Sequence, residues 1–208
     1  MPNWCSNHIT VRGTDPAEIQ RLSDAFKDQR FCNAVIPIPE ELMDPNTGSY
    51  GGDNADEKDQ LRARLLEKYG YSGWYDFCIA HWGTKWDVGD HSGGEISDDG
   101  LEFSAGFDSA WSPPIGVCEA LVEQGFEVAL YYYEPGMAYV GKWENTFDDC
   151  YELGGETSTT VRAAIGDELD DMFGISESMA EWEAENEQEE ELTEWIKDGV
   201  EKRNLETL

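Results

Sequence analysis

The chain has 208 residues, of which 45 are Asp or Glu and 14 are Lys or Arg, so its formal net charge is −31. The few basic residues are scattered and form no stripe, which argues against direct binding of nucleic acid. No apolar run reaches the ~20 residues that a membrane helix needs, and no secretory leader is visible. We therefore expect a cytoplasmic protein whose five cysteines stay reduced.

The acid surplus is distributed over the whole chain: residues 1–150 hold 27 acids and 10 bases, and residues 151–208 hold 18 and 4. Solubility requires a net charge of only roughly 2–8 in a small domain, and a larger surplus repels itself. The acid surplus has four alternative explanations: a basic partner, bound cations, a high-salt environment, or drift on a solvated surface. Duplex DNA has one charge per ~1.7 Å, so 31 charges match about 50 Å of duplex. Mimicry of DNA is therefore one hypothesis.

The first predicted elements are a strand over His8–Arg12 and a helix that begins at Pro16. Asp15 is expected to cap this helix, and Glu18 completes a capping-box pattern. Apolar residues at spacings of three and four predict its buried face: Ile19, Leu22 and Phe26. The next apolar segment, Phe31–Ile38, predicts a second, extended strand.

Two further helices are predicted after the loop-like residues 43–54, one over Asp56–Tyr69 and one beginning at Trp74. The latter carries an apolar stripe: Trp74, Phe77, Cys78, His81 and Trp82. We interpret Cys78 and His81 as core residues, because a zinc site usually needs a second close pair of ligands. Residues 89–100 predict a polar loop, which would leave His91 as the freest histidine.

Strands dominate from Leu101 to Glu152, with one helix between Ser112 and Gln124. Alternating apolar residues predict the strands 101–107, 126–133, 137–143 and, more weakly, 146–152. The order of elements is β-α-β, an insertion of two helices, and β-α-β with extra hairpin strands. This order predicts an α+β fold, specifically a ferredoxin-like split βαβ sandwich with a helical insertion.

The composition changes at Gly154, which predicts a ferredoxin-like domain over residues 1–153 and an acidic helical C-terminal region over residues 154–208. Residues 154–160 have the composition of a linker. The final helix is expected to be amphipathic, because four apolar residues follow helical spacing: Leu192, Trp195, Ile196 and Val200.

Seven glutamates occupy the eleven positions of residues 181–191. This run is either a solvated helix face or a column of carboxylates that imitates the phosphates of one DNA strand. Helical carboxylates three and four residues apart repeat every ~5–6 Å, which is close to the spacing of those phosphates. In the second interpretation, aromatic anchors accompany the carboxylates. The predicted partner-binding residues are Glu181, Glu183, Glu185, Glu187, Glu190, Glu191, Trp182 and Trp195.

The segment Trp82–Trp86 (WGTKW) has two interpretations. It is a recognition surface on which Lys85 stacks against an indole, or a helix end whose tryptophans fill the core and whose Thr84 caps the turn. Adjacent acids such as Asp98-Asp99 indicate nothing in so acidic a chain. With no nucleophile–base pair and no phosphate-binding glycine loop, we predict a protein that is not an enzyme and that has no metal site and no cofactor.

Four separated motifs carry a resemblance to a known family: Met1–Asn7 (MPNWCSN), Trp82–Trp86, Ala110–Pro114 (AWSPP) and Tyr132–Gly136 (YYEPG). On these motifs, residues 1–150 resemble the YubB-type ferredoxin-like family of conjugative plasmids and phages. The resemblance implies the fold and an origin in a mobile element. It implies no catalytic residues.

The charge and the resemblance together predict a non-catalytic phage or plasmid counter-defence inhibitor. Such an acidic, DNA-mimic-like protein would bind a basic host protein, namely a DNA- or RNA-binding defence nuclease, in the host cytosol. The alternative is a small adaptor that binds through its C-terminal amphipathic helix, with self-association into a homodimer as the simplest form. In that case the acidity is incidental.

Overall fold

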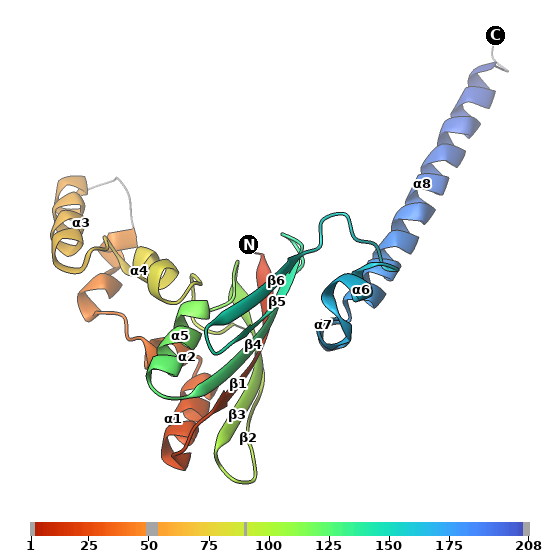
Figure 1. Ribbon diagram of the computed structural model, residues 1–208. Coiled ribbons are helices and arrows are strands. Elements are labelled where there is room, and N and C mark those ends of the chain that lie inside the picture. Colours follow the sequence, from red (N-terminus) through yellow and green to blue (C-terminus); the bar gives the residue numbers. More distant parts are fainter. Residues whose placement is uncertain (1–2, 49–53, 90, 206–208) are drawn as a thin grey trace. The chain divides into compact units, whose positions relative to one another are not determined.

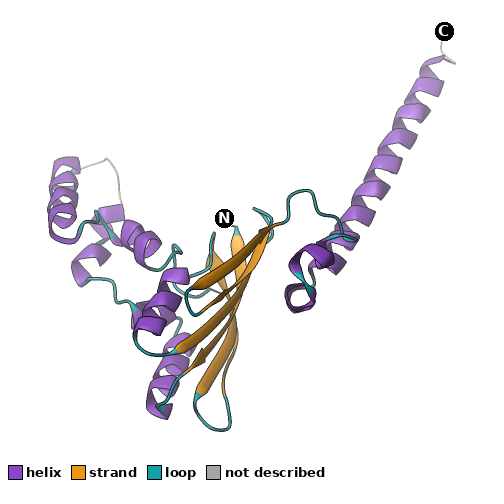
Figure 2. Ribbon diagram, viewed as in Figure 1, coloured by secondary structure: helices purple, strands orange, loops and turns teal. Residues whose placement is uncertain are grey.

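The structure is a computed structural model that describes residues 3–48, 54–89 and 91–205. The chain divides into two compact units, residues 1–150 and residues 151–208, and each is described by itself. The fold is α+β, with strands gathered in one sheet (Figure 2). Within the described ranges, no helix combines the length and the apolar character required to cross a bilayer.

The sheet is antiparallel and has six strands in the order β2-β3-β1-β4-β5-β6 (Figure 1). At its centre, Ile9 lies opposite Ala105 on one side and Leu130 on the other. The strands are β1 (Trp4–Arg12), β2 (His91–Ile96), β3 (Glu102–Ala110), β4 (Glu127–Glu134), β5 (Tyr139–Glu144) and β6 (Phe147–Glu152).

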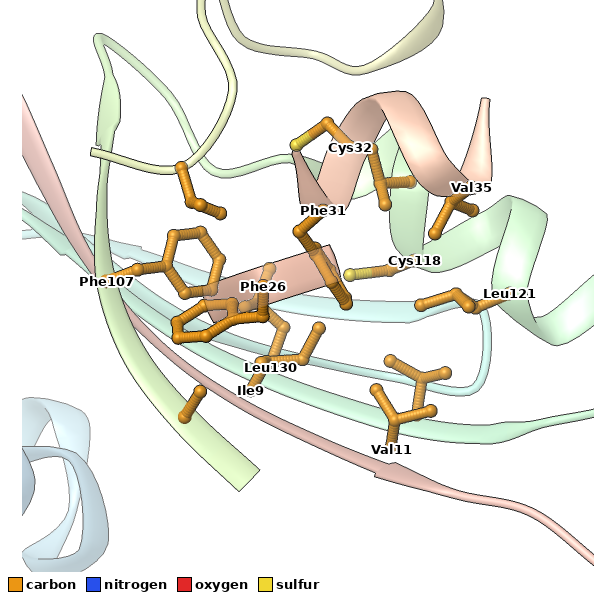
Figure 3. Close-up of a cluster of buried hydrophobic side chains, with 14 of the residues drawn as sticks. Ile9, Val11, Phe26, Phe31, Cys32, Val35, Phe107, Cys118, Leu121 and Leu130 are labelled. Atoms are coloured by element: carbon orange, nitrogen blue, oxygen red, sulfur yellow. The ribbon is translucent and has the colours of Figure 1, made fainter. Parts of the chain in front are cut away.

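The core lies between the sheet and the helices on one of its faces, because β1, β3 and β4 alternate buried and partly exposed side chains. Phe26 of helix α1 (Pro16–Lys27) lies over the strands, 5.4 Å from the ring of Phe103 and 6.0 Å from the ring of Phe31. Figure 3 shows Phe26 and Phe31 in one cluster with Leu121 of helix α5 (Ile115–Glu123) and with inward residues of the strands such as Ile9 and Leu130.

Hydrogen bonds between residues close in the sequence determine where α1 begins and where it ends. As predicted, the Asp15 carboxylate accepts the Ala17 N–H at 2.9 Å. The predicted role of Glu18 is wrong, because its carboxylate accepts a hydrogen bond from Arg21 one turn further along, at 2.8 Å. The helix ends in a Schellman pair: the N–H of Gln29, which has a φ of +56°, bonds the Phe26 carbonyl, and the next N–H bonds the Ala25 carbonyl.

The predicted strand over Phe31–Ile38 is wrong, since Phe31–Val35 is helix α2. The helix begins against the Asp87 carboxylate, whose two oxygens accept the N–H groups of Cys32 and Asn33 at 2.9 Å each. Because Asp87 lies more than fifty residues away in the sequence, this cap leaves no local signal. The apolar residues that imitate a strand instead face the core from one side of a short helix.

The insertion follows α2 and holds helices α3 (Ala55–Tyr69) and α4 (Trp74–His81), both confirming predicted helices. Two 3₁₀ turns, Glu40–Met43 and Pro45–Gly48, precede them. A small second core joins the insertion, made of Leu42, Leu65 and Phe77.

The predicted loop over residues 89–100 is also wrong in part, because His91–Ile96 forms the edge strand β2. The strand pairs with β3 and shifts register between Gly93 and Glu95, where Gly94 has a φ of +80°. The Ser23 hydroxyl also donates to the Gly94 carbonyl at 3.1 Å, and Ile96 packs against the core. These contacts come from outside the strand, whose own sequence lacks apolar alternation. The insertion therefore lies between α1 and β2, not after a second strand at 31–38.

Within its described residues, the second unit has the helices α6 (Val161–Ile165), α7 (Asp167–Phe173) and α8 (Ile175–Leu205). Asp170, which is buried, accepts the N–H and the hydroxyl of Ser176 at 2.7 Å each and so caps the first turn of α8. Arg162 bonds the same carboxylate at 3.0 Å. The buried apolar residues described in this unit are Leu153, Val161, Ile165, Leu169 and Ile175.

Candidate functional site

The segment after helix α4 combines a buried half and an exposed half. Trp82 is buried and its indole N–H donates to the Ile36 carbonyl at 3.0 Å. Thr84 is also buried, and its hydroxyl donates to the carbonyl and accepts from the N–H of Ala110. The core interpretation is therefore confirmed for Trp82, whereas the predicted cap is wrong, because the Thr84 hydroxyl bonds the backbone of β3 and not the turn.

Lys85, in contrast, lies among exposed aromatic rings. Its Nζ is 4.4 Å from the ring centroid of Trp86, 5.0 Å from that of Trp111 and 5.7 Å from that of Tyr75. Trp4 adds a fourth ring, 6.0 Å from Trp86. These four rings, each 38–42% exposed, form what we call the aromatic platform. The predicted stacking of Lys85 on an indole is thus confirmed, and its role in recognition stays a prediction.

Trp111 holds its place in the platform through an unfavourable backbone conformation. Its φ is +72°, which is rare for a bulky residue. The Trp111 N–H donates to the Asn3 carbonyl at 2.9 Å, and the Trp111 carbonyl accepts from the Tyr139 hydroxyl at 3.0 Å. These bonds offset strain of the kind that occurs at binding sites. The sequence does not predict Trp4, Tyr75 and Trp111 as site residues, because nothing in their spacing brings the three together.

A pocket of about 640 Å³ adjoins the platform and shares Lys85 and Trp86 with it. Its wall also includes the indoles of Trp74 and Trp82. The charged groups at its lining are Arg30, Glu40, Lys85 and Asp87. A volume of this size is typical of sites for small molecules. No sequence pattern predicts this pocket, because its lining comes from the residues after α1, from α2, from residues 38–43, from α4 and from the segment after α4.

The Asp87 carboxylate at the pocket is fully engaged by backbone donors. Besides the two N–H groups of α2, it accepts the Val88 N–H at 2.9 Å. Cys78 also lines the pocket, but burial raises the pKa of its thiol to about 12, so it is a poor nucleophile near neutral pH. The pocket therefore offers aromatic surface and charge, and no activated nucleophile from Cys78.

The histidines singled out in the sequence are not brought together with Cys78 in a site. His81 packs on the rings of Phe77 and Tyr71, with centroids 4.3 and 5.2 Å away. The backbone of His91 pairs with Phe107 at the edge of the sheet, so His91 does not belong to a loop. Among the residues that the structure describes, no three His, Cys, Asp or Glu side chains are grouped to hold a metal ion.

The predicted partner-binding residues all lie on α8. Glu181, Glu185 and Glu187 are exposed, and Trp182 is 66% exposed. The side chains of three others lie outside the described residues: Glu190, Glu191 and Trp195. No ion pair joins the described glutamates of α8 to a Lys or Arg of the described residues.

Glu183 differs from its neighbours because it is used inside its own unit. Its carboxylate accepts the N–H of Ser158 at 2.9 Å and the hydroxyl of Ser158 at 2.6 Å. These two hydrogen bonds lower the pKa of Glu183. The residue therefore ties the segment before α6 to α8 and is not a free carboxylate for a partner.

Comparison with known proteins adds one solved structure. No family model matches the chain, and no curated protein matches it. The chain is similar to the crystal structure of protein api92 from Yersinia pseudotuberculosis, described with the family DUF1281. The identity is 12%, the similarity covers 74% of this chain and 95% of that chain, and the TM-score is 0.36. At this level of similarity we transfer neither fold nor function.

Proposed function

We propose that this protein is a non-catalytic counter-defence inhibitor of phage or plasmid origin that binds a basic, nucleic-acid-handling host enzyme. The observation that carries the proposal is the exposed row of carboxylates on α8, none of which the described basic residues neutralise. Unpaired like charges on one helix destabilise it. A basic partner surface would remove that repulsion on binding.

The geometry of α8 suits such a surface. With a rise of about 1.5 Å per residue, carboxylates four residues apart, such as Glu181 and Glu185, are separated by about 6 Å along the axis. Trp182 supplies an exposed aromatic anchor beside them. A helix that presents both charge and an aromatic ring meets the two requirements of a specific, electrostatically steered interface.

We also propose that the first unit has a ferredoxin-like fold. The strand order β2-β3-β1-β4, with α1 and α5 as the connecting helices, supports a ferredoxin-like split βαβ sandwich extended by the β5-β6 hairpin. With this fold, the motifs of residues 1–150 support membership of the YubB-type family and a mobile-element origin. The host cytosol is the location that such a target requires.

The test replaces four exposed α8 glutamates, Glu181, Glu185, Glu187 and Glu189, by Gln. The matched control removes the same charge from exposed positions of the first unit: Glu67, Glu119, Glu123 and Glu127, also to Gln. Binding to a panel of purified restriction and CRISPR-type nucleases is measured at about 50 mM NaCl, in competition with a duplex of about 15 base pairs.

The wild-type protein is expected to bind at least one enzyme of the panel and to displace the duplex from it. The α8 variant should bind at least tenfold more weakly, and the control variant within about threefold of wild type. Equal losses in both variants would mean that only net charge matters. No binding to any enzyme of the panel, or unchanged binding by the α8 variant, overturns the proposal.

A second function is favoured by the exposure of Trp182, namely self-association or adaptor binding through α8. In that case Trp182→Ala should abolish the complex, while the four Glu→Gln changes leave it intact. Light scattering of the wild-type and variant chains at several concentrations measures the oligomer directly. A wild-type chain that stays monomeric at about 100 μM excludes the homodimer.

A further inference from the structure

The pocket beside the aromatic platform contains two cations without acidic partners, in a chain where acids outnumber bases three to one. Neither Arg30 nor Lys85 forms an ion pair with a carboxylate among the described residues. Six other described cations do form such pairs: Arg12, Arg21, Arg62, Lys68, Lys142 and Arg162.

The fold places Arg30 at the pocket through the end of α1. Gln29 adopts its left-handed conformation, and the Arg30 N–H then bonds the Ala25 carbonyl at 2.9 Å. Arg30 thereby leaves the helix at the rim and its exposed side chain lines the pocket. Lys85 lines the same pocket from the segment after α4, with its ammonium over the ring of Trp86.

The two acids that line the pocket, Asp87 and Glu40, differ in how far they neutralise the charges of Arg30 and Lys85. The Asp87 carboxylate accepts three backbone N–H groups, which stabilise its negative charge inside the protein. Glu40 lies exposed in the lining and is therefore screened by water. Three indoles, those of Trp74, Trp82 and Trp86, line the pocket with these charged groups. The rest of the lining is Gln29, Asn33, Ile38, Met43 and Cys78.

We propose that this pocket binds a small planar aromatic anion. The ring of the ligand would lie against the indoles, and its anionic group would bind Lys85 and Arg30. Two sources share this chemistry, a free aromatic carboxylate and a mononucleotide. The inference concerns the first unit alone and does not depend on the acidic surface of α8.

The experiment measures binding of four probes to the full chain by calorimetry at about 50 mM NaCl. 2-Naphthoate supplies ring and charge, 2-naphthylmethanol supplies the ring alone, and cyclohexanecarboxylate supplies the charge on a non-aromatic ring. Adenosine 5′-monophosphate represents the nucleotide source. We expect 2-naphthoate or the nucleotide to bind at least tenfold more tightly than both 2-naphthylmethanol and cyclohexanecarboxylate. Whichever of the two binds more tightly identifies the source.

Three substitutions locate the site. Lys85→Gln should weaken the tighter probe about fivefold, and Arg30→Gln, whose side chain is exposed, about threefold. Glu40→Gln should strengthen binding about twofold, because it removes a like charge. The matched control is Arg64→Gln, an exposed cation of α3 that does not line the pocket, and it should change nothing.

The proposal is overturned if no aromatic anion binds below about 5 mM, or if 2-naphthylmethanol binds as well as 2-naphthoate. It is also overturned if Arg64→Gln weakens binding as much as Lys85→Gln, since the effect would then be the net charge of the chain. The α8 glutamate variant should bind the probes like wild type. This result separates the pocket from the inhibitory function, because either can fail without the other.

Discussion

At the scale of single residues, the turn between β5 and β6 has an unusual composition. Asn145 and Thr146 both have positive φ, +45° and +82°, as in the type I′ turns of two-residue hairpins. Asn suits the first position, and here its side chain also accepts the Val128 N–H at 3.1 Å. Thr is β-branched and suits the second position poorly, where Gly is preferred.

We therefore predict that Thr146→Gly stabilises the protein by roughly 0.5–1 kcal/mol. Urea unfolding followed by circular dichroism measures the change. Asn145→Gly is the control, and it should not stabilise the chain, because it removes the hydrogen bond to Val128. A lower stability of Thr146→Gly would show that the turn does not strain Thr146.

Asp170 is a second residue with a defined energetic role. Burial by itself would raise the pKa of its carboxyl, but the hydrogen bonds from Ser176 and the charge of Arg162 outweigh burial and lower the pKa. A carboxyl with a lowered folded-state pKa stabilises the fold above its unfolded pKa, roughly 3.9. This stabilisation is lost as the pH falls through that value toward the folded-state pKa.

Asp170→Ala should therefore destabilise the second unit by about 1–3 kcal/mol at pH 7. The difference between the variant and wild type should shrink below about pH 4. Hydrogen exchange of the amides of α7 and the first turns of α8, read by mass spectrometry, localises the effect. Equal protection of wild type and variant at pH 7 would contradict the capping role of Asp170.

At the scale of elements, the packing of α4 against α5 depends on the absence of a side chain at Gly116. A Cβ atom built there would lie 2.1 Å from the carbonyl oxygen of His81 and 2.9 Å from its carbon. Both are backbone atoms of the last residue of α4, so they cannot rotate away. The pair of helices also positions Trp82 and Lys85, which follow α4 directly.

Gly116→Ala is accordingly expected to destabilise the protein by about 3 kcal/mol or more. Gly154→Ala is the matched control, because nothing lies within 4 Å of its Cβ position, and its effect should stay within about 0.5 kcal/mol. Thermal unfolding of both variants gives the comparison. Equal stability of the two would mean that α4 and α5 separate without loss of packing.

At the scale of the whole molecule, the net charge of −31 acts against compactness. Raising NaCl from about 20 mM to 500 mM shortens the Debye length from roughly 20 Å to 4 Å and screens this self-repulsion. The melting temperature should therefore rise by several degrees over this range, while any complex with a basic partner becomes weaker.

Choline chloride at the same ionic strength separates screening from specific binding of sodium. An equal rise in melting temperature with both salts is the expected result. A rise with sodium alone would point to cation sites on the acidic surface, and a fall with both would show that attractive ion pairs outweigh the repulsion.

The sequence alone determined the elements whose apolar pattern and caps are local. Helix α1 was predicted from Asp15 and its spacing of apolar residues, and α3, α4, α5 and the central strands from their periodicity. The α+β class follows from their order. The surplus of acid is likewise a property of composition, since every carboxylate contributes to it wherever the chain places it.

Tertiary structure decided the features whose stabilising contacts come from distant residues. Phe31–Val35 became a helix because Asp87 caps it, and His91–Ile96 became a strand because β3 pairs with it. Glu183 is not one of the free carboxylates of α8, because its carboxylate accepts two hydrogen bonds from Ser158. The platform and the pocket combine side chains from separate segments, and only packing of the insertion on the sheet places Lys85 and Arg30 at one cavity.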